Sequence, residues 1–167
     1  MNEELLPVVD ESGNLLGSAT REECHSGSMI LHPVVHLHII NSNGDILLQR
    51  RSVNKRIQPG KWDTAVGGHV DYGESVQQAL IRETSEELGI DASTAKFHVS
   101  YLFHSDIERE LINVHILRPY DELPDSYSRE EIDEVRFWTK EEILQSLGKG
   151  ILTPNFELEY TKILSTL

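Results

Sequence analysis

One segment of the chain, residues 68–90, constrains what this sequence can fold into more than any other. It reads GHVDYGESVQQALIRETSEELGI, in which a glycine-rich turn precedes a run with helical spacing. The run predicts a helix from about Glu74 to Leu88. Glu86 and Glu87 follow Glu83 by three and four positions, so the three carboxylates project from one face of that helix.

These three carboxylates conflict with one another and with the helix that carries them. Like charges at this spacing destabilise a helix by about 0.2–0.5 kcal/mol per pair. They also lie in the last turns of the helix, where the macrodipole disfavours anions. A divalent cation with oxygen ligands would remove the conflict, and a diphosphate would supply the remaining ligands. The segment therefore predicts a Mg²⁺ or Mn²⁺ site at Glu83, Glu86 and Glu87.

The same segment resembles the Nudix box, the signature of the Nudix hydrolase superfamily. That motif runs glycine, five residues, glutamate, seven residues, and then Arg-Glu-apolar-x-Glu-Glu-x-Gly-apolar. The matching positions in this chain are Gly68, Glu74, Arg82, Glu83, Glu86, Glu87, Gly89 and Ile90. The departure is Thr84, which stands at the first apolar position and whose methyl group can still pack. The resemblance implies an α+β Nudix fold, in which a mixed β-sheet is sandwiched between α-helices.

The Nudix resemblance also implies roles for residues of the helix. The three carboxylates would bind metal and take part in catalysis. Arg82 belongs to the catalytic set as the residue that would orient Glu74 or a neighbouring glutamate by a charge-assisted hydrogen bond. The general base would be a glutamate of the box or a carboxylate of a later acidic segment, Glu131 or Glu134, and the sequence leaves this choice open.

Composition limits the partners of the chain. Its 15 Lys and Arg residues against 28 Asp and Glu residues give a formal net charge of −13. This charge argues against nucleic acid and anionic membranes as partners, so bound metal and a local basic patch must receive an anionic substrate. No apolar run approaches the roughly 20 residues that span a bilayer, and the start of the chain lacks signal-peptide features. The sequence predicts a soluble cytoplasmic protein that acts on a small diphosphate.

The length of the chain suits a single domain over residues 1–167, with an N-terminal hairpin at 1–19 as an extension. Strands are predicted at 5–9, 15–18, 34–40, 46–49, 62–66, 96–104, 111–117 and 135–138. Helices are predicted at 20–25, at 74–88, from 140 onward and at 155–164. The edge strands and the hairpin would support a homodimer. Cys24 is the only cysteine, which excludes an intrachain disulfide.

A longer stretch, roughly 25–156, is similar to isopentenyl-diphosphate isomerases, which are Nudix-fold enzymes that move a double bond. The similarity rests on the runs LLQRRS, PGKW and GGH together with Lys55. It implies that Arg51 and Lys55 bind the substrate diphosphate, where the alternative is a solvated run of charges. It also implies a second metal site, for a transition-metal ion such as manganese or zinc, at His25, His32, His69, Glu108 and Glu110.

Departures from the isomerase pattern favour hydrolysis. Gly67 stands where the isomerases place a reactive cysteine, and glycine has no proton to transfer to an alkene. Cys24 precedes His25 and cannot be assumed to substitute for that cysteine. Phe156 replaces the tryptophan that those enzymes carry near the terminal helix, where a π face would steady a cation. The Nudix box, degraded in the isomerases, is intact here.

The sequence thus predicts a divalent-metal-dependent hydrolase that cleaves a diphosphate linkage in a nucleoside diphosphate-X or a related organic diphosphate. The alternatives are an isopentenyl-diphosphate delta-isomerase and a non-catalytic module that recognises a nucleotide. The carboxylates of the helix count against the module, because a pure binder does not need a repulsive set. Elsewhere, His36 and His38 alternate with apolar residues of a predicted strand and are expected to form its polar face.

Overall fold

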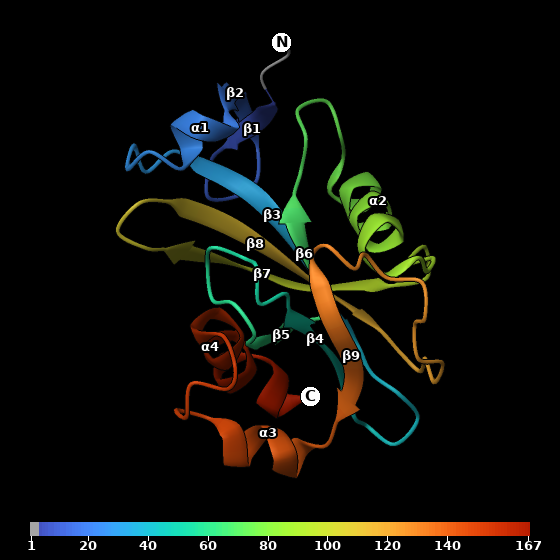
Figure 1. Ribbon diagram of the computed structural model, residues 1–167. Coiled ribbons are helices and arrows are strands. Elements are labelled where there is room, and N and C mark those ends of the chain that lie inside the picture. The colour runs from blue at the N-terminus through green and yellow to red at the C-terminus, as the bar shows by residue number, and fades with distance from the viewer. Residues whose placement is uncertain (1–3) are drawn as a thin grey trace.

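Two β-sheets, a separate two-stranded hairpin near the N-terminus and several helices form the fold, which a computed structural model describes for residues 4–167 (Figure 1). The strands are β1 (Leu5–Val9), β2 (Leu15–Thr20), β3 (Leu31–Ile39), β4 (Ile46–Arg51), β5 (Trp62–Thr64), β6 (Val66–His69), β7 (Lys96–His104), β8 (Arg109–Leu117) and β9 (Ile132–Trp138). The helices are α1 (Arg21–Cys24), α2 (Val76–Leu88), α3 (Lys140–Ser146), α4 (Pro154–Lys162) and the 3₁₀ turn η1 (Leu164–Thr166). The predicted hairpin is present as β1 and β2, although its residues 1–3 lie outside the described residues. Within residues 4–167, no helix combines the length and the apolar character needed to cross a membrane.

The larger sheet is mixed and the smaller sheet is antiparallel. The larger sheet has the order β6-β3-β8-β7, in which β3 and β8 run parallel and the other neighbours run antiparallel. The smaller sheet has the order β5-β4-β9. The helix α2 lies on one side of these strands, and α3 and α4 lie on the other (Figure 1). The predicted α+β architecture is confirmed, with strands β3 to β9 divided between these two sheets and β1 and β2 in a separate hairpin.

Neighbouring residues of β4 show how helices are held on both sides. Leu47 packs in the cluster to which α2 contributes Leu80, whereas Leu48 packs with Ile143 of α3 and Phe156 of α4. Successive side chains of a strand point to opposite faces, so one strand serves both clusters. Burying a side chain of this size contributes about 1.5–3 kcal/mol. This double packing fixes α2 and α4 relative to the strands between them.

The segment between β4 and α2 differs from the sequence prediction. The sequence predicts one strand at 62–66 and a turn at the glycines, but the structure has β5 in the smaller sheet and β6 in the larger. Gly67 and Gly68 belong to β6 and pair with His36 and Val35 of β3. The backbone ladder with β3 outweighs the low strand propensity of glycine. The two glycines therefore form the edge of the larger sheet beside α2.

The start of α2 also differs from the prediction, by two residues. Ser75 is the N-cap: its side chain accepts a hydrogen bond from the N–H of Gln78, whose side chain accepts one from the N–H of Ser75. This capping box fixes where the helix begins. Gly89 ends it as predicted, in the left-handed conformation with φ 68°. Glu74 consequently lies before the helix, where it can meet Arg82.

Candidate active site

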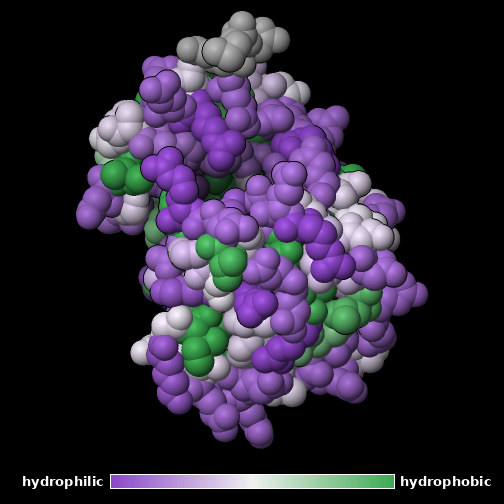
Figure 2. Space-filling view, viewed as in Figure 1, coloured by the Kyte–Doolittle hydropathy of each residue, from purple (hydrophilic) through white to green (hydrophobic). Residues whose placement is uncertain are grey.

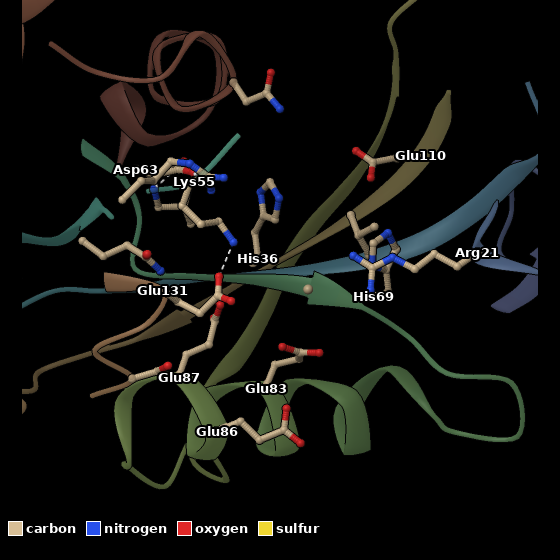
Figure 3. Close-up of a pocket in the computed structure, with 18 of the residues that line it drawn as sticks. Arg21, His36, Lys55, Asp63, His69, Glu83, Glu86, Glu87, Glu110 and Glu131 are labelled. Atoms are coloured by element: carbon tan, nitrogen blue, oxygen red, sulfur yellow. Dashed lines mark hydrogen bonds and ion pairs between the residues drawn. The ribbon is translucent and has the colours of Figure 1, made fainter. Parts of the chain in front are cut away.

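A cleft of about 620 Å³ gathers most of the predicted site residues (Figure 3). Its walls come from α2, from β3, β4, β5, β6 and β8, and from the basic loop, here the segment 50–61, whose first two residues end β4. The predicted site residues that line it are Arg51, Lys55, His69, Glu83, Glu86, Glu87, Glu108 and Glu110. The other predicted site residues are Arg82, His25 and His32, and each contacts a residue of the lining. Arg82 contacts Glu83, His25 contacts Glu108, and His32 contacts Glu110. Residues far apart in the sequence therefore meet at one place.

The carboxylates of α2 lie along the cleft, as the motif predicts (Figure 3). Glu86 is mostly exposed, whereas Glu83 is largely buried. Glu87 has a buried Oε2 atom that finds no hydrogen-bond partner within residues 4–167. A buried carboxylate oxygen without a partner is costly, and a hard cation with oxygen ligands would satisfy it. The donor set fits Mg²⁺ or Mn²⁺.

Burial and repulsion oppose the ionisation of two of these carboxylates. Burial raises the pKa of Glu83 above its usual value, although the hydrogen bond from Arg82 opposes the change. Burial, together with the negative charge of Glu83, raises the pKa of Glu87 to about 8. Glu87 therefore keeps a proton near neutral pH unless a cation is bound, because a nearby positive charge favours the ionised form.

Arg82 donates charge-assisted hydrogen bonds to the carboxylates of Glu74, Glu83 and Glu86, the last at 3.4 Å. Its Nε donates to Glu74 Oε2 at 2.7 Å, and its Nη2 donates to Glu74 Oε1 at 2.9 Å. Its Nη1 donates to Glu83 Oε1 at 2.8 Å, and its Nη2 also reaches the backbone oxygen of His69 at 3.2 Å. The guanidinium thus joins α2 to the preceding loop and to β6. This geometry corresponds to the orienting role that the motif implies for Arg82.

Two cationic side chains of the basic loop enter the cleft with acidic partners. Arg51 Nη1 lies 3.5 Å from Asp63 Oδ2, and Arg51 Nε donates to the backbone oxygen of Ile57 at 3.0 Å. Lys55 forms an ion pair with Glu131, next to the carboxylates of α2 (Figure 3). Both cations are partly buried rather than spread into solvent. A phosphate entering the cleft would compete with the two carboxylates for them.

His25, His32 and His69 converge at one end of the cleft although they come from separate segments. The ring centroids lie 5.4, 5.1 and 5.6 Å apart, and one nitrogen of each ring lies within 4.8 Å of the other two. Glu108 Oε2 lies 2.9 Å from His25 Nε2, and Glu110 Oε2 lies 3.8 Å from His32 Nε2. The ligand set implied by the isomerase resemblance is therefore together in space.

Backbone carbonyls orient two of these histidines. Nδ1 of His25 lies 2.7 Å from the oxygen of Arg21, and Nδ1 of His32 lies 3.0 Å from the oxygen of Ile30. Each Nδ1 must carry the hydrogen in that bond, so Nε2 of the neutral ring keeps its lone pair. Burial lowers the pKa of His32, and burial together with the charge of Arg21 lowers the pKa of His69 to about 3. A neutral imidazole oriented in this way is the form that ligates a divalent metal.

Two buried atoms of the histidine cluster have no hydrogen-bond partner in the part of the chain that the structure describes. They are Nε2 of His32 and Oε2 of Glu108, whose short approach to His25 lacks hydrogen-bond geometry. Burial, together with the charge of Glu108, raises the pKa of Glu110 to about 7. A divalent ion among these ligands would satisfy both atoms, and the mixture of imidazole and carboxylate suits manganese or zinc.

The remaining candidates from the sequence are divided between the cleft and the core. Glu131 lines the cleft and Glu134 does not. Phe156 is fully buried in the core, and its neighbour Asn155 lines the cleft instead. Cys24 is fully buried in a separate apolar cluster, where burial raises its pKa. Within residues 4–167, neither a cysteine nor a tryptophan lines this cleft.

Sequence reasoning missed the environment of His36. The strand pattern predicts His36 and His38 on a polar face, but α4 covers that face and His38 is fully buried. Both rings contact Glu159 of α4, which is itself 1% exposed. His36 also lines the cleft. The sequence gives one sign of this environment: Glu159 lies on the inward side of the terminal helix, which is otherwise apolar.

Comparison with known proteins identifies the family to which these residues belong. Residues 30–156 match the NUDIX domain family. An uncharacterized Nudix hydrolase of Pseudomonas aeruginosa is 34% identical over 134 residues, covering 80% of this chain and 78% of that protein. An isopentenyl-diphosphate Delta-isomerase of Mycolicibacterium vanbaalenii is 38% identical over 87 residues, covering 52% of this chain and 48% of that protein. An uncharacterized Nudix hydrolase of Nostoc sp. is 42% identical over 88 residues, so the chain matches about half of the latter two relatives.

Solved structures share this architecture. The protein DR0079 from Deinococcus radiodurans has a TM-score of 0.77 and 24% identity, covering 95% of this chain and 98% of that one. A MutT protein from Methanosarcina mazei has a TM-score of 0.68 and 26% identity, covering 81% of this chain and 94% of that one. At 24% identity, the similarity to DR0079 shows the fold alone. The family match over 30–156 and the intact motif on α2 show that the protein belongs to the Nudix hydrolase family.

Proposed function

We propose that the protein hydrolyses a diphosphate linkage in a nucleoside diphosphate-X or a related organic diphosphate, with the aid of a divalent cation. The observation that carries this proposal is the presence of Glu83, Glu86 and Glu87 in one cleft with Arg51 and Lys55. Carboxylates suit a hard cation, and arginine and lysine suit phosphate. A diphosphate with its metal ion would therefore meet complementary charge on both sides, despite the net charge of −13.

Each group in the cleft has a part in this proposal. A bound Mg²⁺ or Mn²⁺ would neutralise charge on the diphosphate and lower the pKa of an attacking water. Glu83, Glu86 and Glu87 would hold that ion, and Arg82 would keep Glu83 in position through its hydrogen bond of 2.8 Å. The two cations of the basic loop would bind phosphate oxygens. Their positions would also align the substrate, which is a large part of catalysis in such reactions.

A carboxylate in the cleft would take the proton of the attacking water. Among the glutamates of α2, Glu87 could take that proton only if it is not a ligand of the cation, and only above its pKa of about 8, where it has lost its own proton. Glu131 is the second candidate, since it lines the cleft beside Lys55. If Glu87 is a ligand of the cation, its lone pairs are engaged and Glu131 takes the proton.

We further propose that the histidine cluster holds a second divalent ion, such as manganese or zinc. The support is the convergence of His25, His32 and His69 with two carboxylates, and the unpartnered buried atoms among them. The cluster opens on the same cleft through His69, Glu108 and Glu110. An ion there would add positive charge to the cleft that the diphosphate is proposed to occupy.

Isomerisation of isopentenyl diphosphate is the second candidate function. The histidine cluster and the 38% identity to the isomerase of Mycolicibacterium vanbaalenii favour it. Gly67 and the burial of Cys24 oppose it, because no thiol reaches the cleft. The third candidate, a nucleotide-binding module, is opposed by the carboxylates of α2.

A screen of metal-dependent hydrolysis tests the proposal. The purified protein is incubated with Mg²⁺ or Mn²⁺ and with nucleoside, sugar, dinucleotide and prenyl diphosphates, and isomerisation of isopentenyl diphosphate is assayed in parallel. We expect hydrolysis of a nucleoside diphosphate derivative, abolished in Glu87→Gln and retained in Glu141→Gln, which changes an exposed carboxylate of α3. Isomerisation without any hydrolysis would contradict the proposal.

The cellular location and assembly of the protein stay predictions from its sequence. We propose a cytoplasmic location, a single domain over residues 1–167 and a small-molecule substrate. On the face seen in Figure 2, hydrophilic residues predominate and hydrophobic residues lie scattered.

We propose that a homodimer, if formed, uses an edge strand such as β7, where Phe97 and Leu102 are exposed. Light scattering measures that assembly directly.

A further inference from the structure

A buried carboxylate of α4 collects three polar side chains from the larger sheet. Glu159 is 1% exposed, and its Oε1 lies 2.8 Å from His36 Nδ1 and accepts a hydrogen bond from the hydroxyl of Tyr101 at 2.5 Å. Its Oε2 contacts Nε2 of His38. Every partner of this carboxylate comes from β3 or β7. The nucleotide and metal roles proposed above make no use of this network.

Of the four residues in the network, only His36 reaches the cleft. Its side chain is 16% exposed and lines the cleft, whereas Glu159, His38 and Tyr101 do not line it. A Cβ atom built on Gly67 would lie 3.5 Å from Cδ2 and 3.7 Å from Nε2 of His36. The far edge of the imidazole therefore borders the position where the isomerases carry their reactive cysteine. Within residues 4–167, no hydrogen bond engages His36 Nε2.

The charges around His36 favour its cationic form. Burial alone would lower the pKa of His36, but the charge and hydrogen bond of Glu159 outweigh it and raise the pKa to about 9. Glu110 of β8 and Asp63 of β5 add to the same effect. Burial opposes ionisation of Glu159, and the two histidines overcome it and hold its pKa far below the usual range. Nδ1 of His36 is thus held by the carboxylate of Glu159, and Nε2 of the cationic ring is a hydrogen-bond donor that faces the cleft.

The position of His36 relative to the other cations suits an anionic ligand. In Figure 3 its ring projects between Lys55 and Asp63 on one side and Glu110 on the other, above the strand that carries it. The carboxylates of α2 lie on the opposite side of that strand in this view. Lys55 and His36 line the same cleft, so a phosphate in it can meet both, and an imidazolium donates a charge-assisted hydrogen bond to phosphate.

We propose that His36 contacts a phosphate oxygen of the substrate through Nε2, and that Glu159, which does not reach the cleft, is its positioning residue. This inference rests on the proposed function, because it assumes that a diphosphate occupies the cleft. His38 shows that binding to Glu159 alone does not make a histidine a ligand of phosphate. His38 shares the same carboxylate but is fully buried and has no access to a ligand.

Binding of inorganic pyrophosphate, measured by titration calorimetry with Mg²⁺ present, tests this inference without requiring turnover. We expect His36→Gln to weaken binding by about 10- to 100-fold, the range for one charge-assisted hydrogen bond. Glu159→Gln should weaken binding at least severalfold, and adding it to His36→Gln should cause no further loss. That non-additivity is specific to a residue that acts through His36. The matched control is His115→Gln, which changes a buried histidine of the adjacent strand that does not line the cleft.

A second measurement on the unmodified protein keeps the inference testable if a variant fails to fold. In long-range proton–nitrogen spectra, pyrophosphate should shift the Nε2 resonance of His36 and leave that of His115 in place. Wild-type affinity in a folded His36→Gln, or an unmoved His36 resonance at saturating pyrophosphate, would overturn the inference. If pyrophosphate binds through His36 but no diphosphate is hydrolysed, the proposed function fails and this inference stands.

Discussion

Glu83 of α2 occupies the space that a side chain at position 68 would need. A Cβ atom built on Gly68 would lie 2.3 Å from Cδ, 2.6 Å from Cγ and 2.6 Å from Oε2 of Glu83. Carbon atoms do not approach so closely, so any residue other than glycine at 68 would displace the carboxylate. Gly68, the first glycine of the motif, and Glu83, which lines the cleft, are therefore in contact, although fifteen positions separate them in the sequence.

Gly68→Ala should move the Glu83 carboxylate and lower kcat for diphosphate hydrolysis by roughly 100-fold, since small misplacements of such groups have effects of that size. The backbone at Gly68 is not in the left-handed region, and the Glu83 side chain can swing away. The free energy of unfolding should therefore change by less than about 1 kcal/mol. Gly17→Ala, where a Cβ atom meets nothing within 4 Å, is the matched control. Full activity in Gly68→Ala would show that Glu83 is not needed where it lies.

Glu87→Gln should stabilise the metal-free protein at alkaline pH while lowering turnover by about 100-fold or more. Folding raises the pKa of Glu87 from 4.5 to about 8. Its contribution to stability is therefore full below pH 4.5 and is lost as the pH rises through 8. In EDTA, the free energy of unfolding of Glu87→Gln should exceed that of wild type at pH 8 by on the order of 4 kcal/mol, and the gap should nearly close at pH 4.5.

Added Mg²⁺ should reverse this order, because only the wild type gains from a cation that binds the folded state. Glu86→Gln should lower turnover similarly, since Glu86 lines the same cleft. Denaturant titrations with and without metal measure both effects. Equal stability of wild type and Glu87→Gln at pH 8 in EDTA would argue against a strained carboxylate and thus against the cation site.

Arg51→Ala and Lys55→Ala should raise KM by roughly tenfold and change kcat less, as expected for side chains that grip the diphosphate equally in the ground and transition states. Steady-state kinetics on the substrate found in the screen separates the two parameters. Arg56→Ala removes the same charge from an exposed position of the same loop that does not line the cleft. Indistinguishable kinetics in all three variants would make the basic loop a solvated run of charges.

Removing a ring of the histidine cluster should weaken transition-metal binding. For His32→Ala we expect affinity for Zn²⁺ or Mn²⁺ to fall by about 100-fold or more in equilibrium dialysis, because the loss of a supporting residue alone has effects of 10- to 100-fold. His104→Ala on β7 changes an exposed histidine outside the cluster and should leave affinity unchanged. A wild-type protein that binds neither ion would show that the three rings meet without ligating a metal.

The sequence predicts α2 and its carboxylates well because spacing and capping are local properties. Gly67 and Gly68 are different, since their place in β6 depends on pairing with β3 and not on any preference of glycine. The start of the helix was misplaced by two residues because Ser75 and Gln78 form a capping box inside the motif. The motif thus fixes which residues meet, but tertiary pairing decides how they are held.

The part of the site that could not be predicted depends on partners far along the chain. His36 and Glu159 are 123 residues apart, and the alternation of β3 gives no sign that a helix covers its polar face. The helix α4 likewise turns Asn155 into the cleft and Phe156 into the core, which a single sequence does not reveal. The histidine cluster was expected only through the isomerase resemblance, since its residues lie in three separate segments.

In the proposed reaction, water attacks a diphosphate at the carboxylates of α2. The most direct measurement is a reaction in isotope-labelled water with Mg²⁺ and the best substrate of the screen, followed by mass analysis of the products. We expect a heavy oxygen in one phosphate-bearing product, at a rate that Glu87→Gln lowers by about 100-fold. Substrate consumed without any label, together with conversion of isopentenyl to dimethylallyl diphosphate that Glu110→Gln abolishes, would contradict this account and establish the protein as an isomerase.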